Sequence, residues 1–251
     1  MTIIQQIIEN LYSGQNPYLT VDLKYVDKGY PHTNIKSELL EILFQINKPS
    51  FILECGSMVG GSAIIMAQTL LKIKIDACII CIDPFTGDVN MWDWEKNATW
   101  KFLNLENGIP TIYKRFLANC KEANLDNIIF PINCTTSVGT KLLARLYDQK
   151  RITEFPNYIY LDSAHEPDET YIELKNCWKL LKNNGILFGD DWNWIGVRED
   201  VIKFAEFNKH TIDTDILNSV FKTTKDSQIY NGSIFLYKNQ WVLFKNSTTV
   251  K

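Results

Sequence analysis

The sequence of 251 residues lacks several features that would place a protein in a class at once. No apolar run approaches the roughly 20 residues that cross a bilayer, and Met1–Asn10 has neither the basic start nor the cleavage site of a signal peptide. The net charge is only −3, so a basic surface for nucleic acid is not expected. Repeats, low-complexity tracts and linkers are also lacking. These absences predict a cytoplasmic globular protein, one domain over residues 1–251, without nucleic-acid or membrane partners.

The six cysteines lack the spacing of a metal site or a disulfide framework. Cys78 and Cys81 form a C-x-x-C pair, but the pair lies inside an apolar run, 77–82, that is typical of a buried strand. No second pair follows at ligand spacing. The cysteines are therefore predicted to be small hydrophobic side chains.

The sequence does contain a strand, a glycine turn and a helix in succession. A strand-like run begins at Phe51, the turn holds Gly56, Gly60 and Gly61, and an apolar helical run covers Ala63–Leu71. This layout is typical of a nucleotide-type cofactor site, because glycine permits positive φ angles and close approach of a ligand to the backbone. The spacing G-x-x-x-G-G differs from the dinucleotide fingerprint G-x-G-x-x-G. An ordinary strand-to-helix turn is the competing interpretation.

Strands and helices alternate along the rest of the chain. This order predicts an α/β fold, Rossmann-like and doubly wound, with a mostly parallel seven-stranded sheet, helices on both faces and a C-terminal antiparallel hairpin within 232–245. Residues 1–33 are predicted to be an N-terminal extension and 85–110 a tryptophan-rich insertion. The strands are expected at 51–54, 75–82, 128–132, 158–161 and 186–189.

Acidic side chains follow three of these strands. Asp83 ends the second strand before Pro84, about 20 residues past the glycine turn, where a carboxylate commonly binds a ribose diol. Asp162, Asp190 and Asp191 follow the fourth and fifth strands. Carboxylates brought together at one sheet edge repel one another unless a cation lies between them, and Mg²⁺ with oxygen ligands suits them best. A helix N-cap is the alternative for Asp190 and Asp191.

His165 follows Asp162 by three residues and is expected at the same edge. This position makes it the candidate general base, acting beside the predicted metal ligands. Trp92, Trp94 and Trp100 of the insertion could stack on a sugar or an aromatic substrate, or could form a small core of the insertion itself. The sequence favours neither.

The motifs resemble those of the class I S-adenosylmethionine-dependent methyltransferases. Four segments carry the resemblance, in the expected order over roughly residues 35–210: Leu53-Glu-Cys-Gly-x-x-x-Gly-Gly-Ser62, Ile82-Asp-Pro84, Tyr160-Leu-Asp-x-x-His165 and Leu180–Trp192. The last two are most similar to the metal-dependent O-methyltransferases of the macrocin and catechol types. Catechol enzymes have a lysine base where His165 stands.

The resemblance implies specific site residues and an S-adenosylmethionine cofactor. Glu54 and Gly56 would hold its methionine end, Asp83 its ribose, and Cys134 and Thr135 would lie near its adenine. The remaining predicted cofactor contacts are Ser57, Gly60, Gly61, Ser62 and Pro84, and the predicted metal ligands are Asp162, Asp190 and Asp191, with Asp162 also counted as catalytic.

The expected reaction is transfer of the sulfonium methyl group to a hydroxyl of a sugar or another small molecule with a vicinal diol. Trp92, Trp94, Trp192 and Trp194 are the predicted substrate contacts. The sequence leaves open the acceptor, the oligomeric state and three alternatives: a metal-independent enzyme using His165 alone, a nicotinamide-dependent oxidoreductase and an inactive binding module. Tyr171-x-x-x-Lys175 matches the catalytic pair of short-chain dehydrogenases, but it lies in the helix after the fourth strand and the chain has no N-terminal G-x-x-x-G-x-G turn, so we attribute the match to chance.

Overall fold

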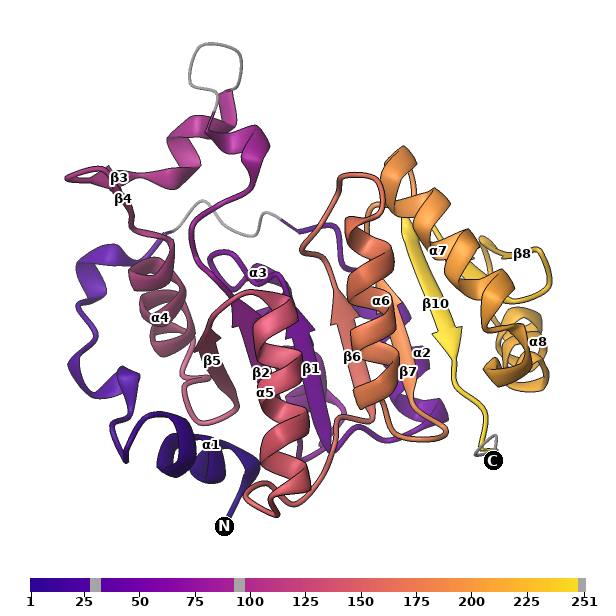
Figure 1. Cartoon of the computed structure of the whole chain (residues 1–251), viewed down its shortest axis with the longest axis horizontal. Coiled ribbons are helices and arrows are strands. Elements are labelled where there is room, and N and C mark those ends of the chain that lie inside the picture. The colour runs from indigo at the N-terminus through magenta and orange to yellow at the C-terminus, as the bar shows by residue number, and fades with distance from the viewer. Residues whose placement is uncertain (28–32, 93–97, 248–251) are drawn as a thin grey trace.

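The computed structural model of the chain describes residues 1–27, 33–92 and 98–247. Its centre is an eight-stranded sheet in the order β5-β2-β1-β6-β7-β10-β9-β8 (Figure 1). The first five strands in this order are parallel. They are β5 (Ile129–Asn133), β2 (Cys78–Asp83), β1 (Phe51–Cys55), β6 (Tyr158–Leu161) and β7 (Ile186–Gly189).

The other three strands are antiparallel. β10 (Gln240–Phe244) pairs with β7 and with β9 (Ile234–Tyr237), which confirms the predicted hairpin. β8 (Ser227–Tyr230) adds an edge strand beyond β9. The predicted fold is therefore confirmed, but the predicted count of seven strands is wrong. The strand β8 is short and half-exposed, and its sequence has no apolar run that would predict a strand.

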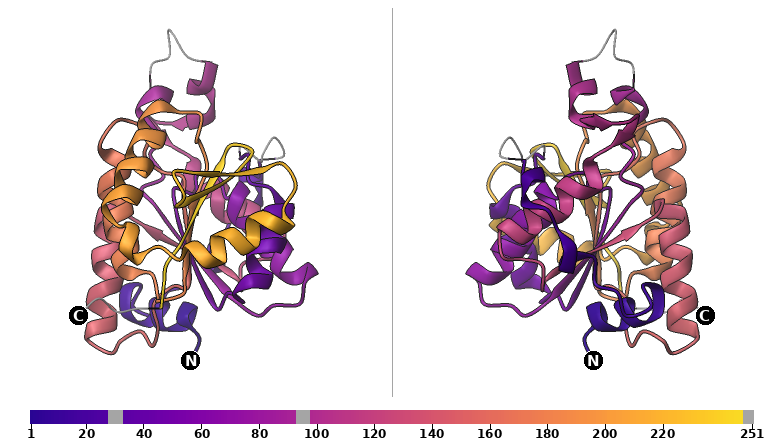
Figure 2. Two further views of the ribbon diagram at one scale, coloured as in Figure 1. Left: turned by 90° about the vertical axis from the view of Figure 1, so that its right-hand side faces the viewer. Right: turned by 90° about the vertical axis from the view of Figure 1, so that its left-hand side faces the viewer.

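Helices cover both faces of the sheet (Figure 2). α5 (Thr136–Asp148), α6 (Glu169–Leu180) and α7 (Ile195–Phe207) pack side by side on one face. The other face is covered by α2 (Ser37–Ile46), α3 (Gly61–Lys72), α4 (Ile112–Glu122) and α8 (Thr214–Thr223). The parallel strands are consequently buried on both sides, which explains their continuous apolar sequences.

The N-terminal extension packs along the β5 edge of the sheet. It contains α1 (Ile3–Leu11), which begins with a Thr2 capping box, and two short 3₁₀ helices, η1 (Pro17–Thr20) and η2 (Leu23–Tyr25). The rings of Tyr12 and Tyr18 both pack edge-on against Phe130 of β5. The extension therefore covers an edge that would otherwise present unpaired backbone groups.

The insertion after β2 projects beyond the carboxyl ends of the parallel strands (Figure 1). Its described part contains η3 (Val89–Met91), η4 (Ala98–Leu103) and a small hairpin of β3 (Leu105–Glu106) and β4 (Ile109–Pro110). None of the helices in the described part of the chain is long and apolar enough to cross a membrane.

Candidate active site

The glycine turn contacts the segment that follows β6. Gly56 has a φ of +83°, and a Cβ atom added to it would lie 2.0 Å from the carbonyl oxygen of Asp162. The backbone on both sides is fixed, because Gly56 N–H donates to the Ile82 carbonyl and Asp162 N–H donates to the Cys55 carbonyl. Only glycine therefore fits at position 56, for both its conformation and its space.

Asp83 supports the glycine turn from the end of β2. One carboxylate oxygen accepts the N–H groups of Ser57 and Met58 at 2.7 and 2.8 Å, and the other accepts the N–H of Phe85 at 2.5 Å. Burial raises the pKa of Asp83, and these three amides partly offset the rise. Asp83 also borders the pocket described below. Since a carboxylate has about four acceptor sites, it keeps one for a ligand.

Glu54 lies beneath the turn rather than in the pocket. Its carboxylate is fully buried and accepts the hydroxyls of Ser57 and Ser62, each at 2.5 Å, and the Cys81 thiol. Ser57 and Ser62 border the pocket, whereas Glu54 does not. Glu54 therefore supports Ser57 and Ser62, which border the pocket, and its predicted contact with the methionine end of a cofactor stays a prediction.

Burial raises the pKa of Glu54 to about 7, and the hydroxyls of Ser57 and Ser62 oppose the rise. The folded state binds the Glu54 proton more tightly than the unfolded chain does. The protonated carboxyl therefore contributes fully to stability below pH 4.5, and this contribution, up to about 3 kcal/mol, is lost as the pH rises through about 7.

We expect the urea midpoint of Glu54→Gln to fall less than that of the wild type between pH 5 and pH 7.5. The exposed Glu206→Gln is the control, and equal pH dependence of all three proteins would contradict the assignment.

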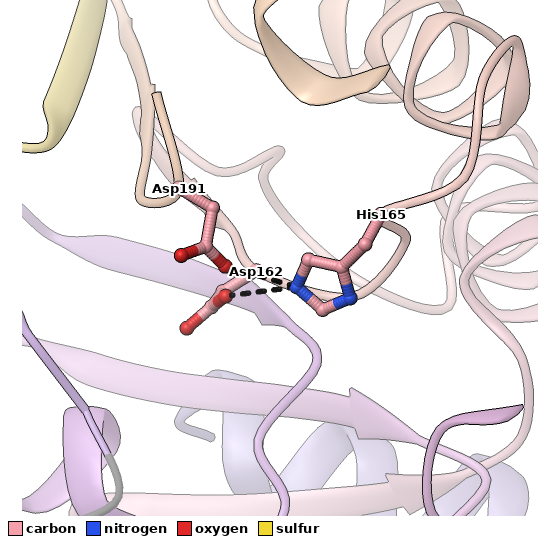
Figure 3. A group of neighbouring side chains, drawn as sticks. All are labelled: Asp162, His165 and Asp191. Atoms are coloured by element: carbon pink, nitrogen blue, oxygen red, sulfur yellow. Dashed lines mark ion pairs between the residues drawn. The ribbon is translucent and has the colours of Figure 1, made fainter. Parts of the chain in front are cut away.

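Asp162, His165 and Asp191 converge at the ends of β6 and β7 (Figure 3). His165 Nε2 lies 3.0 Å from Asp191 Oδ2 and 3.7 Å from Asp162 Oδ1. The Tyr160 hydroxyl donates to the other Asp162 oxygen at 3.2 Å. Within the described part of the chain, this is the one group of histidine, cysteine and acidic side chains close enough to share a metal ion, with ligand atoms within 4.8 Å of one another.

His165 is surrounded by carboxylates. Its Nδ1 lies 3.5 Å from Asp88 Oδ2 of the insertion, and its ring packs on Trp194 with centroids 5.2 Å apart. Burial alone would lower the pKa of His165, but hydrogen bonds and charges from Asp162 and Asp191 outweigh it and raise the pKa to about 11. The two carboxylates therefore favour the protonated imidazole.

Asp190 is oriented differently from the other predicted metal ligands. It is buried, and its Oδ1 accepts the Asp191 N–H at 2.9 Å and the Asn239 side-chain amide at 3.2 Å. Burial and the charges of Asp162 and Asp191 raise its pKa to about 6. Asp190 borders the pocket but is not part of the converging group. The third member of that group is His165, whereas the predicted third ligand was Asp190.

A pocket of about 610 Å³ joins the glycine turn to this cluster. A volume of this size is ordinary for a site that binds a small molecule. Of the predicted residues, the pocket is lined by Gly56, Ser57, Gly61, Ser62, Asp83, Pro84, Asp162, His165, Asp190, Asp191 and Trp194.

Several pocket residues were missed from the sequence, and they come from the end of the extension, the residue that follows it and the insertion. They are Thr33, Asn34, Asp88, Met91 and Phe102, among others. No motif marks them. The one usable signal was the length of the insertion, since long connections in compact domains often border binding sites.

The remaining predicted residues lie outside the pocket lining. Gly60 is the left-handed N-cap of α3, Cys134 follows β5, and Thr135 caps α5. Trp92 is exposed and donates to the Thr86 carbonyl. Trp192 is buried and packs edge-on against Tyr230, and its predicted substrate contact stays a prediction. Trp94 lies outside the described residues.

A family profile for a methyltransferase domain matches residues 53–192. The chain belongs to the methyltransferase-domain family. The matched segment begins in β1 and ends just after β7, so it includes the glycine turn, Asp83 and the whole cluster around His165. The methyltransferase predicted from the sequence motifs is thereby confirmed. Searches found no curated protein significantly similar to the methyltransferase.

Solved structures with a similar fold are distant in sequence. One is a protein from Klebsiella pneumoniae described as a "putative O-methyltransferase", with a TM-score of 0.52, 13% identity, and coverage of 97% of this chain and 96% of the other. The O-methyltransferase from Bacillus cereus in complex with SAH has a TM-score of 0.49, 12% identity and coverage of 97% and 98%. The O-methyltransferase TomG from Streptomyces achromogenes, involved in tomaymycin synthesis and in complex with SAM, has a TM-score of 0.48, 14% identity and coverage of 86% and 83%.

Proposed function

We propose that this methyltransferase transfers a methyl group from S-adenosylmethionine to a hydroxyl of a small molecule. The observation that carries the proposal is a single pocket into which both the glycine turn and the Asp162–His165–Asp191 cluster open. The first part has the features of a donor site and the second has groups that orient and deprotonate an acceptor.

The donor would bind along the glycine turn and the start of α3. Gly61 and Ser62 border the pocket at the helix N-terminus, where backbone N–H groups have no partner in the helix. Asp83 stands at the end of the neighbouring strand with one acceptor site to spare for a ribose hydroxyl. S-adenosylmethionine would supply a methyl group that its sulfonium charge has already activated.

The acceptor hydroxyl would lie beside Asp162, Asp191 and His165. Two carboxylates and an imidazole with mutually close ligand atoms suit a divalent cation, with Mn²⁺ as well as the predicted Mg²⁺ to be considered because a nitrogen donor is present. A cation held there would supply Lewis-acid activation of a substrate hydroxyl. If the two carboxylates hold the cation without the imidazole, a neutral His165 would accept the hydroxyl proton at Nε2, oriented by Asp88 at Nδ1 and by the Trp194 ring.

A metal-independent reaction with His165 as the base is the second candidate. It is less favoured, because Asp162 and Asp191 raise the pKa of His165 and so favour the protonated imidazole, which is not a base. The exposed Trp194 ring at the pocket suits the face of a sugar or aromatic ring, which supports a glycan or another vicinal diol as the acceptor.

The test combines binding with turnover. S-adenosylmethionine at 100 times its Kd should stabilise the protein by about 2.7 kcal/mol and raise Tm by several degrees, whereas NAD⁺ should not. Incubation of methyl-labelled donor with a panel of catechols and glycosides should give a methyl ether that mass spectrometry detects. EDTA should abolish formation of the ether until Mg²⁺ or Mn²⁺ is restored.

Full turnover in excess EDTA would favour the metal-independent reaction. Binding without turnover on any acceptor would favour a binding module, and no binding would overturn the proposal.

A further inference from the structure

Two buried polar side chains lie on α4, behind the pocket. Arg115 and Asn119 are one helical turn apart, so they lie on the same face of the helix. Arg115 is 6% exposed and Asn119 is 1% exposed. Neither borders the pocket, and neither belongs to a motif that the reaction uses. Polar groups buried this deeply are retained only with partners, and here the partners come from three other segments.

Arg115 joins the N-terminal extension to the insertion. Its guanidinium forms an ion pair with the Asp27 carboxylate and also donates to the Phe102 carbonyl at 2.5 Å. Phe102 borders the pocket, and Asp27 follows η2 of the extension. A guanidinium presents several donors in a rigid fork, so one side chain can hold both segments at once.

Asn119 joins the same extension to the glycine turn. Its Oδ1 accepts the Asp27 N–H at 2.8 Å, and its Nδ2 donates to the Val59 carbonyl at 2.9 Å. Val59 belongs to the turn and borders the pocket. Asp27 is therefore held twice, by its carboxylate and by its backbone.

We propose that Arg115 and Asn119 are positioning residues that couple residues 17–27 of the extension and the insertion to the glycine turn, so that donor affinity depends on the extension. The inference rests on the proposed function of the pocket. The inference gives a role to residues that precede the family-matched segment 53–192. Arg115 and Asn119 would act through Phe102 and Val59, which border the pocket, rather than by contact with a ligand.

The proposal is tested by titration calorimetry with S-adenosylhomocysteine. We expect Arg115→Met to weaken binding at least tenfold, because it removes the ion pair to the half-buried Asp27 carboxylate and the hydrogen bond to the Phe102 carbonyl. Asp27→Asn, which is nearly isosteric, should weaken binding about fivefold. The double variant that combines Arg115→Met with Asp27→Asn should lose no more affinity than Arg115→Met alone, since the two residues act through their shared ion pair. Arg115→Lys should keep the ion pair but not the second donor, and should fall between Arg115→Met and the wild type.

The control is Glu106→Gln. Glu106 also connects the extension to the insertion, accepting from Tyr25 and Lys114, but at an exposed site where an ion pair contributes little. The affinity of Glu106→Gln for S-adenosylhomocysteine should equal that of the wild type.

Amide exchange separates positioning from a merely structural role. Arg115→Met should lose protection in residues 17–27, 57–59 and 98–103 while the central strands keep theirs. Wild-type affinity in folded Arg115→Met or Asp27→Asn would overturn the proposal, and so would unchanged protection of these segments. If the wild type itself binds no S-adenosylhomocysteine, the proposed function falls and this inference with it.

Discussion

Gly56→Ala is expected to weaken S-adenosylhomocysteine binding by at least 100-fold. The new methyl group would lie 2.0 Å from the Asp162 carbonyl oxygen, and the φ of +83° is strained for any residue with a Cβ. Neither backbone can retreat cheaply, because each is hydrogen bonded to the neighbouring strand. The variant must therefore separate the glycine turn from the segment that carries Asp162. Calorimetric titration and Tm together measure the effect.

Gly232→Ala is the matched control for that variant. Gly232 also has a positive φ, +70°, but an added Cβ there meets nothing within 4 Å. It therefore carries the conformational strain, on the order of 1–2 kcal/mol, without the collision. If both variants lower Tm equally and both keep wild-type affinity, the contact between the turn and Asp162 has no role in binding.

Asp162→Asn is expected to lower kcat/KM by about 10³-fold or more while changing donor affinity less than threefold. The substitution keeps the shape and can still accept the Tyr160 hydroxyl, but it removes the charge that faces His165 and any ion held beside it. Initial rates with saturating S-adenosylmethionine measure the loss, and S-adenosylhomocysteine titration checks the donor site.

Asp168→Asn serves as the comparison for Asp162→Asn. Asp168 lies six residues further along the same connection, is exposed, and pairs with Lys203 at the surface. It should have wild-type kinetics. An Asp162→Asn enzyme with more than a tenth of wild-type turnover would place the chemistry on other groups in the pocket, with Asp191 and Asp88 the next to test.

The fold was predictable because its central strands are continuous apolar runs separated by amphipathic helices. A helix, an edge strand and a small hairpin were missed for different reasons. α8 carries a usable signal, with Asp213 as its N-cap and apolar residues at helical spacing, whereas β8 alternates without an apolar face. The β3–β4 hairpin also carried a signal, since Asn107-Gly108 supplies two positive φ angles in its turn.

The site was predictable only where it lies at the ends of parallel strands. That rule brought Asp83, Asp162, His165 and Asp191 to one pocket. It could not indicate which way a side chain turns after the strand ends. Asp190 and Trp192 flank Asp191 in sequence, yet only Asp191 belongs to the group around His165, and Trp192 packs against Tyr230 outside the pocket lining. The pocket residues of the extension and the insertion could not be predicted from the sequence, because their position depends on tertiary contacts such as those of Arg115.

The pairing of β1 with β6 has a consequence for how this enzyme acquires activity. Ile52 pairs with Tyr158 and Cys55 with Leu161, so partners about a hundred residues apart must meet before Asp162 reaches Gly56. Closing a segment of this length costs entropy, and topologies with such distant contacts fold slowly. The pocket therefore forms only after β6 has paired with β1, which requires the chain as far as Leu161 and the connection beyond it.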